Sequence, residues 1–180
     1  SAQTITYDQH NKFSFQPGIM NTVKNVALAC PGVIKDGLVY YATNLGWPEV
    51  ADPKEELGLP NIGIVINDAV AAGLGESVLR SIGQELMDLY YITLGTGVGS
   101  CHVQSGEAYD LDLGHIHIGG NYYCEGCRST GCLNSELESK HLPKALSDSD
   151  LDYMARTLSK AIEQKKMDGN TLLVLGGGIS

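Results

Sequence analysis

Short runs of apolar residues, each closed by glycine, proline or a polar pair, mark candidate strands along this chain. The runs Asn25–Cys30, Gly37–Tyr41, Ile62–Ile66 and Thr171–Leu175 have the length and composition of strands. In Ile62–Ile66 the apolar residues continue without polar alternation, which is typical of a strand covered on both faces in a parallel or mixed sheet. We therefore expect Ile62–Ile66 and Thr171–Leu175 to be buried strands.

A helix is predicted directly after the third run. Residues Ala69–Arg80 are rich in alanine and carry spaced apolar positions, and the preceding Asp68 can cap the first turn. The polar pair Asn67 and Asp68 therefore lies between a strand and a helix. In open α/β sheets, active-site residues are found at such a junction.

An amphipathic helix is predicted near the C-terminus, where apolar residues recur at i, i+3, i+4 and i+7. It begins near Ser149 or Asp150 and ends before Asp168 and Gly169. The positions that form its apolar face are Leu151, Met154, Ala155, Leu158, Ala161 and Ile162.

A second sheet begins after the first predicted helix. Leu89–Leu94 and Ser100–Gln104 predict two strands around the glycine-rich turn Gly95–Gly99. We place a domain boundary between residues 82 and 88, which divides the chain into residues 1–81 and 82–180.

Length and charge narrow the class of protein. The chain has 180 residues, 43% of them hydrophobic, enough for one ordinary domain or two small lobes with a real core. A net charge of −9 without a basic patch argues against nucleic-acid binding. No apolar run approaches the roughly 18–20 residues that span a bilayer, and no leader pattern opens the chain. We expect a soluble, cytoplasmic protein with no membrane partner.

Two glycine turns follow predicted strands and are candidates for phosphate binding. Glycine lets the backbone approach a phosphate and direct its N–H groups inward, and Thr96 adds a hydroxyl between Gly95 and Gly97. Gly176–Gly178 forms the second turn. Each turn alone is equally compatible with an ordinary tight turn, but two of them together with Asn67-Asp68 favour a nucleotide cleft.

Asp68 is the candidate general base. A carboxylate at the end of a strand can accept the proton of a substrate hydroxyl as that oxygen attacks phosphorus. The alternative, a helix N-cap, is compatible with the same position, and the two roles can coexist.

Three cysteines within nine residues give the strongest spacing signal. Cys124, Cys127 and Cys132, with a nearby imidazole, match a tetrahedral Zn²⁺ site of the Cys₃His type. The fourth ligand is His115 or His117, since a strand would direct the two to opposite faces. Four protein ligands would make the zinc structural. A disulfide or redox CxxC pair is the alternative.

Taken in order, the motifs resemble the ROK family of sugar kinases and sugar-responsive repressors. They cover nearly the whole chain from about residue 25: Asn25–Gly32, Asn44–Trp47, Asn67–Glu76, Leu94–Gly99, Gly114-His115, the cysteine segment Cys127–Leu133 and Gly176–Ser180. The resemblance implies a two-lobed, actin-like (ribonuclease-H-like) α/β sugar kinase fold. It also implies a sugar lobe that ends at residue 81 and a nucleotide lobe from residue 82.

By position, the resemblance implies roles for single residues. Asp68 is similar to the base that deprotonates a sugar hydroxyl, most often the one on C6, and His115 to a residue that ligates zinc and shapes the sugar pocket. The positions that resemble sugar-binding residues are Asn44, Gly46, Asn67, Asp112, His115 and Asn134. Those that resemble nucleotide-binding residues are Gly95, Thr96, Gly97, Gly176, Gly177 and Gly178.

Three departures from the family pattern concern specificity. Asp112 stands where the family has a Glu two residues before Gly-His, and Asn134 stands where it has a sugar-binding Glu. The first cysteine, Cys124, lies one position early. The loop geometry and the choice of sugar are therefore expected to differ.

The family pattern also begins with a strand bearing Asp-x-Gly-Gly-Thr, which this chain does not show before residue 25. We expect the 180 residues to belong to a longer chain, with segments missing at both ends. With that strand present, the resemblance implies an enzyme that uses ATP and Mg²⁺ to phosphorylate a hexose or a glucoside, with structural Zn²⁺, acting as a homodimer. The alternative is a non-catalytic, sugar-sensing regulator of the same family.

Overall fold

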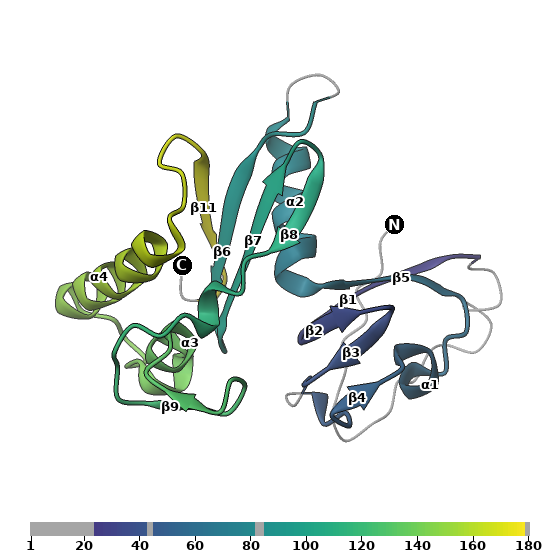
Figure 1. The fold of residues 1–180 in the computed structure, drawn as a ribbon, viewed down its shortest axis with the longest axis horizontal. Helices are drawn as coiled ribbons and strands as arrows, with labels where there is room; N and C mark the ends of the chain where they lie inside the picture. Colours follow the sequence, from purple (N-terminus) through teal and green to yellow (C-terminus); the bar gives the residue numbers. More distant parts are fainter. Residues whose placement is uncertain (1–23, 43–44, 82–84, 179–180) are drawn as a thin grey trace. The chain divides into compact units, whose positions relative to one another are not determined.

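The structure is a computed structural model that describes residues 24–42, 45–81 and 85–178 (Figure 1). The chain divides into two compact units, Ser1–Asp68 and Ala69–Ser180. Helix α2 (Asp68–Arg80) begins at this division and belongs almost entirely to the second unit, whereas the sequence placed it with the first.

The first unit contains a parallel strand pair and a small antiparallel sheet. Strand β1 (Val26–Cys30) pairs in parallel with β5 (Ile62–Asn67), so both strands end at the same edge. Strands β2 (Val33–Lys35), β3 (Leu38–Tyr40) and β4 (Val50–Ala51) form an antiparallel sheet. The short helix α1 (Pro53–Leu57) is capped by the Asp52 side chain, which accepts from the Lys54 N–H at 2.8 Å.

The second unit is built on a mixed four-stranded sheet of order β11-β6-β7-β8. Strands β6 (Leu89–Leu94), β7 (Val98–Gln104) and β8 (Glu107–Asp110) form an antiparallel meander, and β11 (Leu172–Gly176) adds to β6 in parallel. The hairpin predicted around Gly95–Gly99 is present, with Leu94 paired to Val98.

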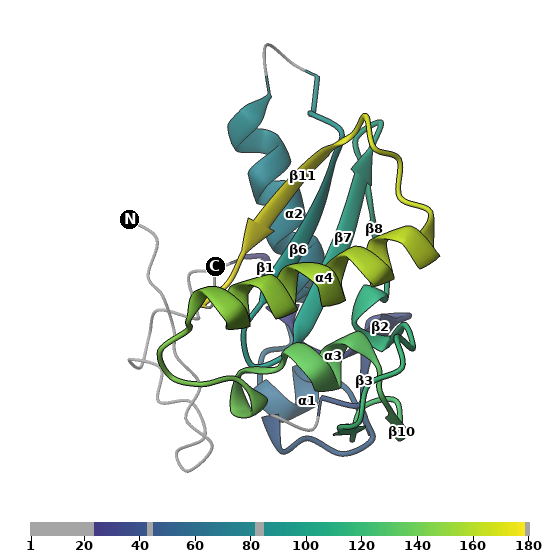
Figure 2. The same cartoon turned by 90° about the vertical axis from the view of Figure 1, so that its left-hand side faces the viewer.

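Helices cover both faces of this sheet (Figure 2). On one face, Gly73 of α2 approaches so closely that a Cβ there would lie 2.8 Å from the Cys101 sulfur. On the other, α4 (Asp148–Lys165) closes the main core. The fully or nearly buried members of that core are Ile92, Leu94, Leu113, Leu133, Leu137, Met154, Leu158 and Ala161.

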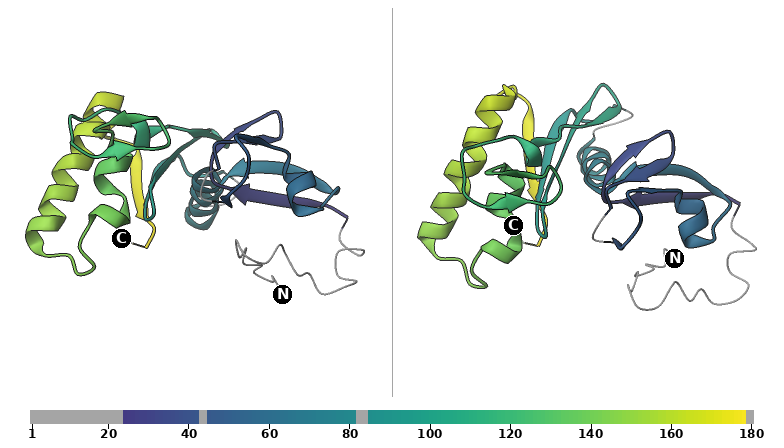
Figure 3. Two further views of the ribbon diagram at one scale, coloured as in Figure 1. Left: turned by 90° about the horizontal axis from the view of Figure 1, so that it is seen from below. Right: turned by 60° about the horizontal axis from the view of Figure 1, so that its bottom comes forward.

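The segment between β8 and α4 leaves the sheet and packs beside α4 (Figure 3). It contains the 3₁₀ helix η2 (Leu113–His115), the two-residue strands β9 (Tyr123–Cys124) and β10 (Ser129–Thr130), helix α3 (Leu133–Leu137) and the 3₁₀ helix η3 (Ser139–His141). Helix α3 contacts η2, β9 and α4. We call this segment, residues 111–147, the excursion. All the residues of the predicted cysteine cluster lie in it.

Helix α4 starts earlier than the periodicity predicted. Its N-cap is Ser147 rather than Ser149 or Asp150, and Asp150 completes a capping box by accepting from the Ser147 N–H at 2.8 Å. The helix ends at Lys165, and the N–H of the left-handed C-cap Lys166 donates to the carbonyls of Ile162 and Glu163, before Asp168 is reached.

The predicted burial of two strands is wrong. In β5 only Ile62 is buried, and Ile64 is 62% exposed. In β11 the three leucines are each 39–49% exposed. Within the described residues, β5 pairs only with β1 and β11 only with β6, so each strand has an open edge. Among those residues, no helix is long and apolar enough to cross a membrane.

Candidate functional site

Four side chains of the excursion converge on one point. One ligand atom each from His115, Cys124, Cys127 and Cys132 lies within 4.8 Å of the others. His115 ends η2, Cys124 ends β9 and Cys132 is the N-cap of α3, so three separate elements hold the cluster. The four predicted ligands are therefore brought together.

His115 joins the cluster and His117 does not. The sequence argument assumed a strand, but Leu113–His115 is a 3₁₀ turn that projects His115 toward the cysteines. His117 instead pairs through its backbone with Cys132 in an isolated bridge. This backbone bridge brings the start of α3 next to the histidine segment.

The sulfurs and the imidazole influence one another strongly. Burial would raise the pKa of the Cys132 thiol, but hydrogen bonds from His115 and Ser135 outweigh it and lower that pKa to about 6. The hydrogen bond with Cys132 raises the pKa of His115. Burial and hydrogen bonds to the other two thiols raise the pKa of Cys127 to about 12. Cys132 is therefore the thiol of the cluster that loses its proton most readily, and a bound cation would have to displace the proton of Cys127.

The donor set fits zinc. A tetrahedral Zn²⁺ with Zn–S bonds of about 2.3 Å places its sulfurs roughly 3.8 Å apart. The Cys124 sulfur lies 3.8 Å from His115 Nδ1, and all four atoms fall within the 4.8 Å limit. Three soft thiolates with one imidazole bind Zn²⁺ in preference to Mg²⁺ or Ca²⁺, which prefer oxygen ligands.

A buried carboxylate that the sequence did not single out joins the segment just before Cys124 to α4. Glu136 is 4% exposed, and it accepts from the Tyr122 N–H and the Tyr153 hydroxyl, each at 2.9 Å. His141 stacks on Tyr122 with ring centroids 4.0 Å apart. Spacing could not reveal these residues, because they meet only when the excursion folds back on α4.

The two glycine turns lie side by side. Strands β6 and β11 are parallel and in register, Thr93 opposite Gly176, so both turns leave the same edge of the sheet. A Cβ on Gly177 would lie only 2.2 Å from the Leu94 carbonyl oxygen. The two turns that the sequence analysis assigned to one nucleotide cleft are thus neighbours in the sheet.

The turn Gly95–Gly99 is held by hydrogen bonds to the segment that follows Cys132. The Asn134 carbonyl oxygen accepts from the Val98 N–H at 2.8 Å, and the Ser139 N–H donates to the Gly95 carbonyl at 2.9 Å. Thr96 at the tip is exposed.

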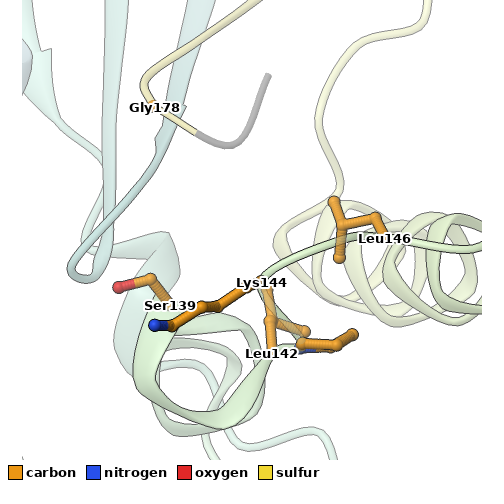
Figure 4. A pocket seen from close by; sticks show the side chains of 6 residues that line it. Ser139, Leu142, Lys144, Leu146 and Gly178 are labelled. Atoms are coloured by element: carbon orange, nitrogen blue, oxygen red, sulfur yellow. The ribbon is translucent and has the colours of Figure 1, made fainter.

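A pocket of about 420 Å³ opens next to the second turn. Ser139, Leu142, Pro143, Lys144 and Leu146 line it together with Gly178 (Figure 4). The sequence analysis missed Ser139, Leu142 and Lys144. They follow α3 in a segment that contains no recognisable motif. Nothing in the neighbouring sequence distinguishes Lys144 from an ordinary surface lysine.

In the first unit, Asp68 stands at the C-terminal end of β5 and is exposed. Burial raises the pKa of the neighbouring Cys30 thiol to about 11, with a further contribution from the charge of Asp68. The Asn67 amide donates to the Gly32 carbonyl at 3.0 Å, so this side chain also fixes the turn after β1. Cys30 and Cys101 are buried core residues, as the sequence suggested.

The remaining predicted sugar-binding positions are spread over both units. Gly46 has a left-handed φ of +67° and open space around it. Asn44 lies outside the described residues. Asp112 is exposed, precedes η2, and its charge contributes to the raised pKa of His115.

Comparison with known proteins defines the family. The profile of the ROK family matches residues 10–175, so the chain belongs to the ROK family. The fold is accordingly the actin-like, ribonuclease-H-like α/β fold of ROK sugar kinases, as the sequence predicted.

Individual relatives are sugar kinases. A glucokinase from Halalkalibacterium halodurans is 37% identical over 147 residues, which are 74% of this chain and 43% of that protein. An N-acetylmannosamine kinase from Citrobacter koseri is 28% identical over 152 residues, 78% of this chain and 51% of the relative. The structure of an inorganic polyphosphate/ATP-glucomannokinase from Arthrobacter sp. matches with a TM-score of 0.60 and 26% identity, covering 86% of this chain and 58% of the other. The chain spans about half the length of the curated relatives it matches.

Proposed function

We propose that the protein containing this chain transfers the γ-phosphoryl group of ATP to a sugar hydroxyl, with Asp68 as the general base. The observation that carries the proposal is the parallel pairing of β6 with β11, which sets two glycine turns side by side next to a pocket. Membership of the ROK family and the sugar kinase relatives support it.

In the proposed reaction, the sugar oxygen forms a bond to the γ-phosphorus while the bond from that phosphorus to the leaving oxygen of ADP breaks. The Asp68 carboxylate accepts the hydroxyl proton as the new bond forms, a contribution of roughly 10²–10⁴-fold to the rate. The exposed position of Asp68 at a strand end leaves it accessible to a substrate. By resemblance the acceptor is the C6 hydroxyl of a hexose or glucoside.

We assign nucleotide binding to the second unit. Gly95, Thr96 and Gly97 would meet the phosphates, together with Mg²⁺, and Gly176–Gly178 would lie on the adenosine side. Lys144 adds a cation to the pocket beside Gly178, where it can neutralise phosphate charge. The first unit, with Asn67 and Asp68, would then contribute to the sugar side.

Sugar contacts are assigned to Asn44, Gly46, Asn67, Asp112 and His115, with a reduced role for Asn134. The carbonyl of Asn134 and one of its two amide hydrogens are already engaged, which leaves one hydrogen for a sugar hydroxyl. A zinc ion on His115 and the three cysteines would be structural, because four protein ligands fill its tetrahedron. When bound, it cross-links η2, β9 and α3.

The decisive test is ADP release from Mg-ATP by the full chain with a panel of glucose, mannose, N-acetylmannosamine and β-glucosides. Asp68→Asn should abolish turnover with the accepted sugar, while Asp152→Asn, an exposed aspartate on α4, should leave it unchanged. Equal turnover in Asp68→Asn and the parent would overturn the assignment of the base. Sugar-dependent thermal stabilisation without any turnover would favour the sugar-sensing alternative.

Nucleotide binding can be tested separately. Lys144→Met should weaken binding of a fluorescent ATP analogue about tenfold, a typical effect of losing one charge-assisted contact. Lys160→Met, on the exposed part of α4, serves as the matched control. Equal affinity in both variants would remove Lys144 from the nucleotide site.

A further inference from the structure

Asn134 lies between the metal cluster and the first glycine turn. Its carbonyl oxygen accepts from the Val98 N–H at 2.8 Å, and its amide nitrogen donates to the Cys124 sulfur at 3.8 Å. One planar side chain therefore connects a candidate zinc ligand to a turn that is distant in sequence from it.

The orientation of this amide is determined by its partners. The Val98 N–H can only donate, so it requires the carbonyl oxygen of Asn134. That choice directs the NH₂ group toward Cys124, whose sulfur is the acceptor. Reversing the amide would place a donor against a donor, so the two hydrogen bonds exist together or are lost together.

Close packing confines the side chain further. A Cβ on Gly97 would lie 2.6 Å from the Asn134 oxygen, and a Cβ on Gly114 would lie 2.4 Å from the Val98 carbonyl oxygen and 3.6 Å from the Asn134 Cβ. Glycines at positions 97 and 114 thus provide the space in which Asn134 contacts the turn.

A second hydrogen bond comes from the same segment. Ser139, which follows α3, donates its N–H to the Gly95 carbonyl at 2.9 Å. The turn is therefore held at Gly95 and at Val98 by a segment of eight residues that begins with the cluster member Cys132. Any displacement of Cys132 and Cys124 would be transmitted to both ends of the turn.

We propose that Asn134 is a positioning residue that couples zinc occupancy to the conformation of the glycine turn Gly95–Gly99. A bound zinc ion would hold the Cys124 sulfur in place, and the hydrogen bond from Asn134 to that sulfur would then fix the amide plane. The fixed amide in turn holds the Val98 N–H. This inference rests on the proposed zinc site, and it does not depend on the identity of the sugar.

Hydrogen exchange at residues 95–99, measured with and without zinc and without sugar or nucleotide, tests the coupling. In the parent protein, zinc removal should accelerate exchange at these amides about tenfold, the effect of losing one hydrogen bond. Asn134→Ala should show the fast exchange whether zinc is bound or not. Asn170→Ala, an asparagine in an exposed turn near Asp168, should behave as the parent.

Asn134→Asp distinguishes coupling from simple loss of structure. Its carboxylate retains an acceptor for the Val98 N–H but has no donor for Cys124, so the turn should remain protected after zinc removal. If zinc removal merely unfolds the excursion, Asn134→Asp will lose protection like the parent, and the proposal is wrong. It is equally overturned if zinc leaves exchange in the parent unchanged.

Metal content keeps the two proposals distinguishable. Zinc bound in less than equimolar amount by the parent after reconstitution would contradict the zinc site itself. Equimolar zinc with no change in exchange at residues 95–99 would contradict only the role of Asn134.

Discussion

The two glycine turns share one edge of a sheet but are held in different ways. The turn Gly95–Gly99 connects two antiparallel strands; its Val98 N–H donates to the Asn134 side chain, and its Gly95 carbonyl accepts from the Ser139 N–H. The turn Gly176–Gly178 follows β11, a strand whose leucines are exposed, and is fixed by the contact of Gly177 with the backbone of Leu94. The first turn depends on one side chain and one backbone N–H of another segment, and the second on the absence of a side chain at Gly177.

For the phosphate-binding role that we propose for both turns, this difference amounts to two solutions to the same requirement. A backbone that binds phosphate needs fixed N–H groups, because free energy lost in ordering them would weaken binding. The first turn is ordered through the excursion that carries the metal cluster, so its order can respond to the metal. The second is ordered by direct contact between backbones, and a response to the metal is not expected there.

The largest effect is expected at Gly177. Its φ is +102°, and a Cβ would lie 2.2 Å from the Leu94 oxygen, so Gly177→Ala combines backbone strain with overlap against main chain that cannot move aside. We expect a loss of about 3 kcal/mol in the free energy of unfolding. Gly178→Ala meets nothing within 4 Å and should change it by less than about 0.5 kcal/mol. Urea unfolding of the two variants measures this, and similar midpoints would contradict the proposed difference.

A smaller loss is expected at Gly97. Here the added Cβ meets the Asn134 oxygen at 2.6 Å, but that atom belongs to a side chain that can shift. Gly97→Ala should cost about 1–2 kcal/mol and abolish the zinc dependence of exchange at Val98. Gly95→Ala, in open space, is the control. A Gly97→Ala variant that keeps the zinc dependence would show that the Asn134 contact is dispensable.

Ser139→Pro should have a still smaller effect. Proline removes the N–H that donates to Gly95, and the preceding Glu138, with φ −67° and ψ 140°, already has the conformation that proline requires before it. We expect a loss of about 1 kcal/mol and faster exchange confined to the first turn. Ser139→Ala keeps the N–H and should match the parent. Faster exchange in Ser139→Ala as well would assign the effect to the side chain instead.

The smallest effect is expected in the helix that leads into the second turn. Hydrogen bonds from the Ser147 hydroxyl and N–H lower the pKa of Asp150, so its contribution is complete above the ordinary aspartate pKa and is lost as the pH falls through the lowered value. Asp150→Asn should lower the Tm slightly at pH 7, and the difference from the parent should shrink as the pH falls through the lowered pKa of Asp150. A difference that stays constant with pH would show that the charge of Asp150 is not involved.

Local features of the sequence predicted much of the fold. The hairpin around Gly95–Gly99, the helix after Asn67 and the strand before Gly176 depend on short-range periodicity and on glycine, and all three are present. The burial of β5 and β11 could not be predicted in this way, because an apolar run shows the capacity to be buried but not which neighbouring strand or helix covers it. The observed start of α4 also differs from the predicted one by a few residues. Several neighbouring polar residues can act as N-cap, and the sequence does not show that Ser147 is the one that does.

The candidate site can likewise be separated into features predicted by local sequence and features set by tertiary contacts. By itself, the sequence predicted the type of chemistry, because cysteine spacing and glycine turns are typical of a zinc-type donor set and of a phosphate-binding backbone, and both patterns are local. Only the tertiary structure decided that His115 rather than His117 joins the cysteines, that Glu136 is buried and bonded to Tyr122 and Tyr153, and that Asn134 connects Cys124 to the glycine turn. These contacts join residues far apart in the chain, and their geometry depends on how the excursion packs against α4, which no local pattern encodes.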